Sequence, residues 1–155
     1  MNLDSINLHI SIRNQNFDIN QEIKQLSSGN LNIGGIVSFL GIVRDLSKNN
    51  NLKFMEIEHY PGMTETALMK ICNEAKTRWE IQAISVIHRI GKLYPGDNIV
   101  LLLVGSVHRT QAFEASEFVM DFLKSKAPFW KKETTLTEAT WIEENPLDEQ
   151  KLLRW

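Results

Sequence analysis

Several segments of the chain have the apolar patterns of strands. Residues 8–12 alternate between apolar and polar side chains, which predicts an opening strand. Residues 34–44 and 98–107 are longer runs rich in β-branched and other apolar residues. The second run is so uniformly apolar that we expect it in the interior of a sheet. Further strands are predicted over 54–60 and 81–90, with a turn of proline and glycine between 81–90 and 98–107.

Other segments place apolar residues three or four positions apart, as on the buried face of a helix. Asp18 is suited to cap a short helix over 19–26. A proline-glycine turn leads to a second helix that starts near Thr64, and a last, long helix is predicted over 110–124. Strands interrupted by helices without strict alternation predict an α+β or α/β sandwich.

Length and composition exclude several classes of protein. The chain of 155 residues fits one domain, 1–155, with a substantial core. A net charge of −2 without a long basic run argues against nucleic-acid binding. The single cysteine, Cys72, excludes an internal disulfide and fits a reducing cytoplasm. The polar N-terminus and the shortness of the apolar run 98–107 argue against a signal peptide and a membrane span, so we expect a cytoplasmic protein.

The segment 123–133 places four lysines around a rigid group of proline and aromatic residues, and it is the stretch best suited to chemistry. Pro128 lacks a backbone N–H and has a fixed φ, so the preceding helix must end near it. Lys124 and Lys131 then lie on opposite sides of a stiff corner that can aim both ammonium groups into one cleft. Close like charges and desolvation would lower each lysine pKa toward the range useful for acid or base catalysis. The alternative is that the lysines are solvated, with those in the last helical turn complementing the helix dipole.

Other cationic side chains favour an anionic, phosphate-bearing substrate. His108 and Arg109 stand where the most apolar strand gives way to the long helix, and free N–H groups at a helix start favour a phosphate. The Arg109 guanidinium can hold an oxyanion through two hydrogen bonds, and His108 can share the anion or move a proton. Arg44 stands at the exit of another strand. The alternative for all of them is an ordinary solvated residue at the end of an element.

The sequence lacks a motif for a protein nucleophile, a metal or a cofactor. Acidic residues and a histidine alternate over 56–59, but no second histidine lies nearby to complete a metal site. Cys72 lies on the apolar stripe of a helix, where a thiol is an inert packing group. His9 and His88 fall within predicted strands, which favours structural roles. We therefore expect no metal and no cofactor, and catalysis by positioning and proton transfer.

Short motifs occur in a fixed order along the chain: FLGIVR at 39–44, EHYPGM at 58–63, VIHRIG at 86–91, PGD at 95–97, HR at 108–109 and the lysine-rich segment 124–133. Together they resemble the large, catalytic subunits of molybdopterin synthase. The match runs from about Gly34 to Trp130 and beyond, and several independent motifs in order are more specific than any one of them. The first thirty or so residues and the acidic C-terminal tail carry little of the pattern.

The resemblance implies an α/β hammerhead fold of the α+β class, in which helices cover a mixed sheet and a smaller β subdomain is attached. It implies a sulfurtransferase that installs the two dithiolene sulfurs of molybdopterin in cyclic pyranopterin monophosphate, or precursor Z, during molybdenum cofactor biosynthesis. The sulfur arrives as a thiocarboxylate on the C-terminal Gly-Gly tail of a small ubiquitin-like subunit. A homodimer with one small subunit at each end gives a heterotetramer, without nucleic-acid or membrane partners.

The resemblance also implies roles for residues at matching positions. Lys131 is the leading candidate for the general acid or base, and Lys124 is expected to hold the thiocarboxylate or an acyl intermediate. Arg44 is expected to contact the pterin or its phosphate, while His108 and Arg109 reach across the dimer to bind the terminal phosphate. The rest of the expected substrate-binding set comprises two pocket-wall residues and neighbours of the key groups: Phe39, Met120, Ile42, Val43, Lys132 and Glu133. Lys132, like Lys126, is otherwise surface or supporting charge.

Two rival functions fit the same residues. A basic cleft would equally bind the tail of a ubiquitin-like partner in a non-catalytic docking module. An unrelated phosphate-ester enzyme could use Arg44, His108 and Arg109, and it would turn over without a thiocarboxylate partner.

Overall fold

The computed structural model describes residues 7–45, 52–135, 138–143 and 145–155. Helices and strands alternate irregularly along these residues, as expected for an α+β protein. In chain order the elements are β1 (Asn7–Arg13), α1 (Ile19–Ser27), β2 (Gly35–Ile42), β3 (Leu52–His59), α2 (Met63–Arg78), β4 (Ile81–Arg89), β5 (Gly91–Leu93), β6 (Asn98–Ser106), α3 (Arg109–Ser125), β7 (Phe129–Thr135), β8 (Ala139–Trp141) and α4 (Pro146–Leu152).

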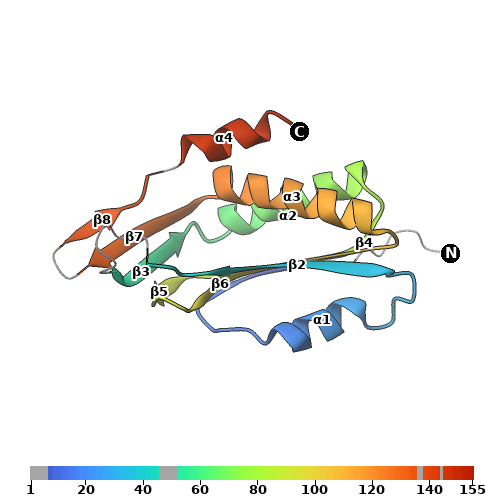
Figure 1. Cartoon of the computed structure of the whole chain (residues 1–155), viewed down its shortest axis with the longest axis horizontal. Helices are drawn as coiled ribbons and strands as arrows, with labels where there is room; N and C mark the ends of the chain where they lie inside the picture. The colour runs from blue at the N-terminus through green and yellow to red at the C-terminus, as the bar shows by residue number, and fades with distance from the viewer. Residues whose placement is uncertain (1–6, 46–51, 136–137, 144) are drawn as a thin grey trace.

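The first sheet is mixed and has the strand order β1-β4-β6-β2. Its β1 and β4 pair in parallel, whereas β6 pairs antiparallel with both β4 and β2. Helices α2 and α3 cover one face of this sheet and α1 covers the other (Figure 1). The prediction of a mixed sheet covered by helices is therefore confirmed, and β6 occupies the interior position expected from its uniform apolar sequence.

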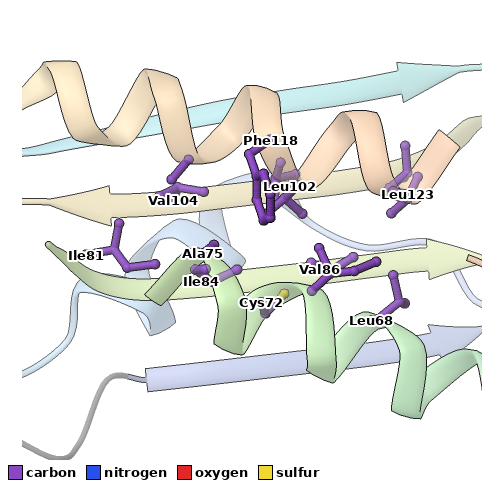
Figure 2. Close-up of a cluster of buried hydrophobic side chains, with 14 residues drawn as sticks. Leu68, Cys72, Ala75, Ile81, Ile84, Val86, Leu102, Val104, Phe118 and Leu123 are labelled. Carbon is purple, nitrogen blue, oxygen red and sulfur yellow. The ribbon is translucent and has the colours of Figure 1, made fainter. Parts of the chain in front are cut away.

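Alternation along β6 explains why that sequence is apolar throughout. Leu101 and Leu103 pack in the cluster beneath α1, whereas Leu102 and Val104 pack in the cluster beneath α2 and α3. Successive side chains of a strand point to opposite faces, so a strand covered on both sides needs apolar residues at every position. Figure 2 shows the second cluster, in which Phe118 of α3 lies against Leu102.

The second sheet is smaller in extent and has the strand order β5-β3-β7-β8. It lies at the end of the molecule opposite the N-terminus (Figure 1). A third buried cluster, which includes Val43, Met55, Ile57 and Leu93, fills the space beside it, and Ile99 packs against both this cluster and the one beneath α2 and α3. The two sheets are therefore joined by continuous apolar packing.

The predicted helices and the strands before residue 110 are confirmed with small shifts at their ends. The capping prediction is also confirmed, because Asp18 Oδ1 accepts a hydrogen bond from the Gln21 N–H over 3.2 Å. The segment 91–97, predicted as a turn alone, contains the short strand β5, and the pairing of β7 with β3 was not predicted. Within the described ranges, the helices are all too short or too polar to cross a lipid bilayer.

Candidate functional site

A cleft of about 480 Å³ opens where the end of α3, β7, the chain after β2 and the C-terminal segment meet. Its volume lies in the range of about 300–1,000 Å³ that is usual for small-molecule sites. The floor is largely apolar and carries charged groups of both signs. The charged residues that line the cleft are Arg44, Lys124, Lys131, Glu133, Glu143 and Asp148.

Pairing of β7 with β3 directs Lys131 into the cleft. Lys131 lies opposite the buried Ile57 in the antiparallel register, and Phe129 and Glu133, two positions to either side, also line the cleft. Residues two apart on a strand share one face. Lys132 therefore points to the other face, where its Nζ lies 5.7 Å from the ring centroid of Trp141.

A buried hydroxyl fixes the corner between α3 and β7. The last turn of α3 closes with the Lys126 N–H donating to the Phe122 carbonyl over 2.7 Å. Beyond it, the Thr64 hydroxyl donates to the Pro128 carbonyl over 2.9 Å and accepts from the Tyr60 N–H over 3.1 Å. The start of α2 thus holds the proline corner, which brings Lys124 and Lys131 to the same cleft.

Arg44 is positioned by a turn in the segment before β6. The Val43 N–H donates to the Asp97 carbonyl over 2.8 Å, and the Gly96 N–H donates to the Val43 carbonyl over 2.7 Å. Gly96 has a φ of 92°, a conformation that favours glycine. This double contact fixes the backbone one residue before Arg44, and the Arg44 side chain lines the cleft.

Electrostatics distinguish Lys131 from an ordinary surface lysine. Burial, with a further contribution from the positive charge of Lys124, lowers the pKa of Lys131 from 10.5 to about 8, and the carboxylate of Asp148 acts in the opposite direction. A lysine with such a pKa exists in both protonation states near neutral pH, so it can donate or accept a proton. The expected combination of like charge and desolvation therefore acts on Lys131.

The C-terminal segment supplies a wall of the cleft, with Ile142, Glu143, Asn145 and Asp148 among the lining residues. Its far end is anchored on α3, because Asp121 Oδ2 accepts from Arg154 Nη2 over 2.6 Å and from Trp155 Nε1 over 2.7 Å. The acidic tail, which carried little of the sequence pattern, thus places carboxylates opposite the cationic groups.

The structure brings together only part of the expected site. Arg44, Lys124 and Lys131 meet in the cleft, as do their neighbours Ile42, Val43 and Glu133. Residues outside the lining of the cleft are Phe39, His108, Arg109, Met120 and Lys132.

His108 and Arg109 lie far from the cleft within one chain. They stand at the start of α3, whereas Lys124 is in its last turn. At about 1.5 Å per residue, the helix separates Arg109 from Lys124 by roughly 22 Å. Met120 packs against the core beneath α3, and Phe39 is 42% exposed on the edge strand β2.

Sequence reasoning missed several cleft residues. His88, expected to be structural, lines the cleft although its relative exposure is only 2%. Met55 belongs to the apolar floor, and Asp148 faces Lys131 from α4. These residues come from separate strands and the tail, and no local spacing signalled that they would meet.

Comparisons with known proteins agree with this architecture. The family model described as MoaE protein matches residues 12–126. The molybdopterin synthase catalytic subunit of Ralstonia nicotianae is 49% identical over 146 residues, which cover 94% of this chain and 83% of that protein.

Solved structures are also similar to this chain. The molybdopterin biosynthesis MoaE protein from Burkholderia ambifaria has a TM-score of 0.82 at 46% identity, with 96% of this chain and 97% of that chain covered. A complex of subunits 1 and 2 of the molybdopterin-converting factor from Helicobacter pylori has a TM-score of 0.72 at 22% identity, with 89% and 91% covered, and supports the fold alone.

Proposed function

The chain belongs to the MoaE protein family, whose curated relatives are molybdopterin synthase catalytic subunits, and we propose that its basic cleft is where sulfur is transferred to precursor Z. As a member of that family it is a sulfurtransferase of molybdenum cofactor biosynthesis. The proposal takes residues 1–155 as one large-subunit domain that works in the cytoplasm. The sulfur donor is the thiocarboxylate at the C-terminus of a small ubiquitin-like subunit.

The convergence of two lysines from different elements carries this proposal. Lys124 from the end of α3 and Lys131 from β7 line one cleft together with Arg44, and the pKa of Lys131 is lowered to about 8. Two ammonium groups and a guanidinium can bind two anionic groups, the thiocarboxylate of the donor and the phosphate of the substrate, next to each other in one cleft. A solvated helix end would not place a half-buried lysine opposite the buried Ile57.

Lys131 is assigned the proton transfers. The thiocarboxylate sulfur attacks a carbon of the pterin side chain, and water then cleaves the acyl–sulfur bond, leaving sulfur on the pterin and a carboxylate on the tail. As an ammonium group, Lys131 donates a proton to an oxygen leaving the substrate, and as an amine it accepts one from the attacking water. Lys124 stabilises the negative charge of the thiocarboxylate and of the oxyanion that forms during cleavage.

The small subunit and a second copy of the chain complete the assembly in this proposal. The partner is inferred from the relatives' name, the catalytic subunit of molybdopterin synthase. His108 and Arg109 lie roughly 22 Å from Lys124 along α3, so they serve the cleft of the other protomer. The edge strand β2 with the exposed Phe39, and Phe113 at 60% exposure on α3, offer apolar surface for such a homodimer.

The Lys131→Ala variant distinguishes the proposed function from a docking module and from a phosphate-ester enzyme. The assay is a single-turnover reaction with precursor Z and thiocarboxylated small subunit, in which dithiolene formation is measured. We expect loss of dithiolene formation while the small subunit still binds. Unchanged dithiolene formation would overturn the catalytic assignment. A reaction that proceeds without the small subunit would instead favour the phosphate-ester enzyme.

A further inference from the structure

His88 lies at the floor of the cleft, and contacts on two sides hold its ring in one orientation. Nδ1 lies 2.8 Å from the carbonyl oxygen of Arg89. A carbonyl oxygen can only accept, so Nδ1 carries the ring proton. One face of the ring stacks on Phe129, with centroids 3.9 Å apart and planes inclined by 18°. The ring is therefore fixed in both position and tautomer.

The imidazole is neutral and has an unused acceptor. Burial lowers the pKa of His88 to about 3, and the charges of Lys131, Lys124 and His59 act in the same direction, while the Arg89 carbonyl opposes them. With the proton on Nδ1, the other nitrogen, Nε2, has a free lone pair. In this structure Nε2 accepts no hydrogen bond from any of the described residues, Lys131 included.

Lys131 is the donor best placed to use this acceptor. Phe129, which stacks on His88, and Lys131 are two positions apart on the cleft face of β7, about 7 Å along the strand. The ammonium charge of Lys131 acts on His88 more strongly than any other charge. The other charged groups that act on this pair or line the same cleft are Lys124, His59, Asp148, Arg44, Glu133 and Glu143.

We propose that His88 is a positioning residue for Lys131: the flexible lysine side chain turns so that its ammonium group donates a hydrogen bond to the unprotonated Nε2, and the ammonium group is thereby aimed at the substrate. This inference rests on the proposed role of Lys131 as general acid or base. A neutral acceptor favours the ammonium form, so it offsets part of the effect of burial and keeps a protonated donor available near neutral pH. After Lys131 gives up a proton, the amine still has N–H groups to keep the same contact.

Two substitutions at His88 distinguish the effect of the Nε2 acceptor from the effect of the stacked ring. His88→Phe keeps a ring to stack on Phe129 and lacks the acceptor, whereas His88→Gln places an amide oxygen near the position of Nε2. The pKa of Lys131 is read from an NMR titration of its Nζ in protein with isotope-labelled lysine, and the Lys131→Arg protein identifies the signal.

We expect His88→Phe to lower the Lys131 pKa by about one pH unit, the size expected for losing a hydrogen bond to a charged group. At pH 7 the protonated fraction of Lys131 should then fall from about nine-tenths to about one-half, so we expect the single-turnover rate to fall at least about twofold with little change in substrate affinity. His88→Gln should restore both properties.

An unchanged Lys131 pKa in folded His88→Phe protein would overturn the inference, and so would an equal fall in His88→Gln. If His88→Phe does not fold, His88→Asn decides the matter, because its amide N–H can still donate to Arg89 while no acceptor replaces Nε2. Because the titration does not depend on turnover, it is independent of the catalytic assignment, which would fail instead through normal turnover by Lys131→Ala.

Discussion

Replacing Lys131 with methionine is expected to stabilise the folded protein while abolishing sulfur transfer. Burial and the charge of Lys124 lower the pKa of Lys131 from 10.5 to about 8. At about 1.4 kcal/mol for each pKa unit, the folded state disfavours the ammonium form by about 3 kcal/mol. The side chain is still partly exposed, and solvent screening reduces the expected gain to about 1–3 kcal/mol at pH 7. Methionine is unbranched and uncharged, so it can fill the same space without this cost.

The sign of the pH dependence follows from the two pKa values. Below pH 8 the lysine is protonated in both the folded and the unfolded chain, and the folded state bears the full cost. Between about 8 and 10.5 the folded state loses the proton while the unfolded state keeps it, so the stability of the unmodified protein rises with pH. The advantage of Lys131→Met therefore shrinks across this window and disappears above it.

Urea denaturation at pH 7 and pH 10, at one fixed protein concentration, measures this effect. Lys132→Met is the matched control, because Lys132 lies on the other face of the same strand and contacts Trp141. It is expected to change the free energy of unfolding by less than about 0.5 kcal/mol. The reasoning is refuted if Lys131→Met is less stable than the unmodified protein at pH 7, or if its gain is the same at both pH values.

Further predictions concern the neighbours of Lys131, the start of α3 and the corner before β7. Lys124→Met should raise the pKa of Lys131 but leave it below 10.5, because burial is the larger cause; an NMR titration without any rise would contradict this pairing of charges. Arg109→Ala should weaken binding of the phosphate-bearing substrate more than binding of the small subunit, and equal losses by calorimetry would argue against a phosphate contact. Thr64→Val should lower the free energy of unfolding by about 1–3 kcal/mol, because its buried hydroxyl joins α2 to the corner. Thr66→Val, at an exposed hydroxyl of α2, should change the free energy by less than about 0.5 kcal/mol in the same urea experiment, and equal effects would exclude a special role for the buried bridge.

Local patterns predicted the elements that bury apolar residues. The uniform run that became β6 and the stripe on α2 could be read from the sequence because the core selects the residues at each position. The strand β7 carries mostly charged and polar residues, and its strand conformation depends on pairing with β3. A pairing between segments so distant in the chain leaves no local period, which is why β7 was not predicted.

The residues of the candidate site also fall into two groups, those that the sequence indicated and those that only the fold brings to the cleft. Lys124 and Lys131 could be singled out because Pro128 and two aromatic residues lie between them in the sequence. The contributions of His88 and Asp148 depend on where β4 and α4 come to lie, which the sequence does not indicate at short range. Family resemblance supplied roles for His108 and Arg109, and the structure explains why a single chain does not bring them to the cleft.

The central claim is that one cleft joins a thiocarboxylate donor to a pterin monophosphate through Lys131. A single-turnover reaction of the folded protein with precursor Z and thiocarboxylated small subunit, followed by detection of the dithiolene, tests it most directly. We predict that the dithiolene forms with the unmodified protein and with Lys132→Met, and that it does not form with Lys131→Met although the small subunit binds. Absence of the dithiolene with the unmodified protein, or its formation at the normal rate with Lys131→Met, would contradict the claim.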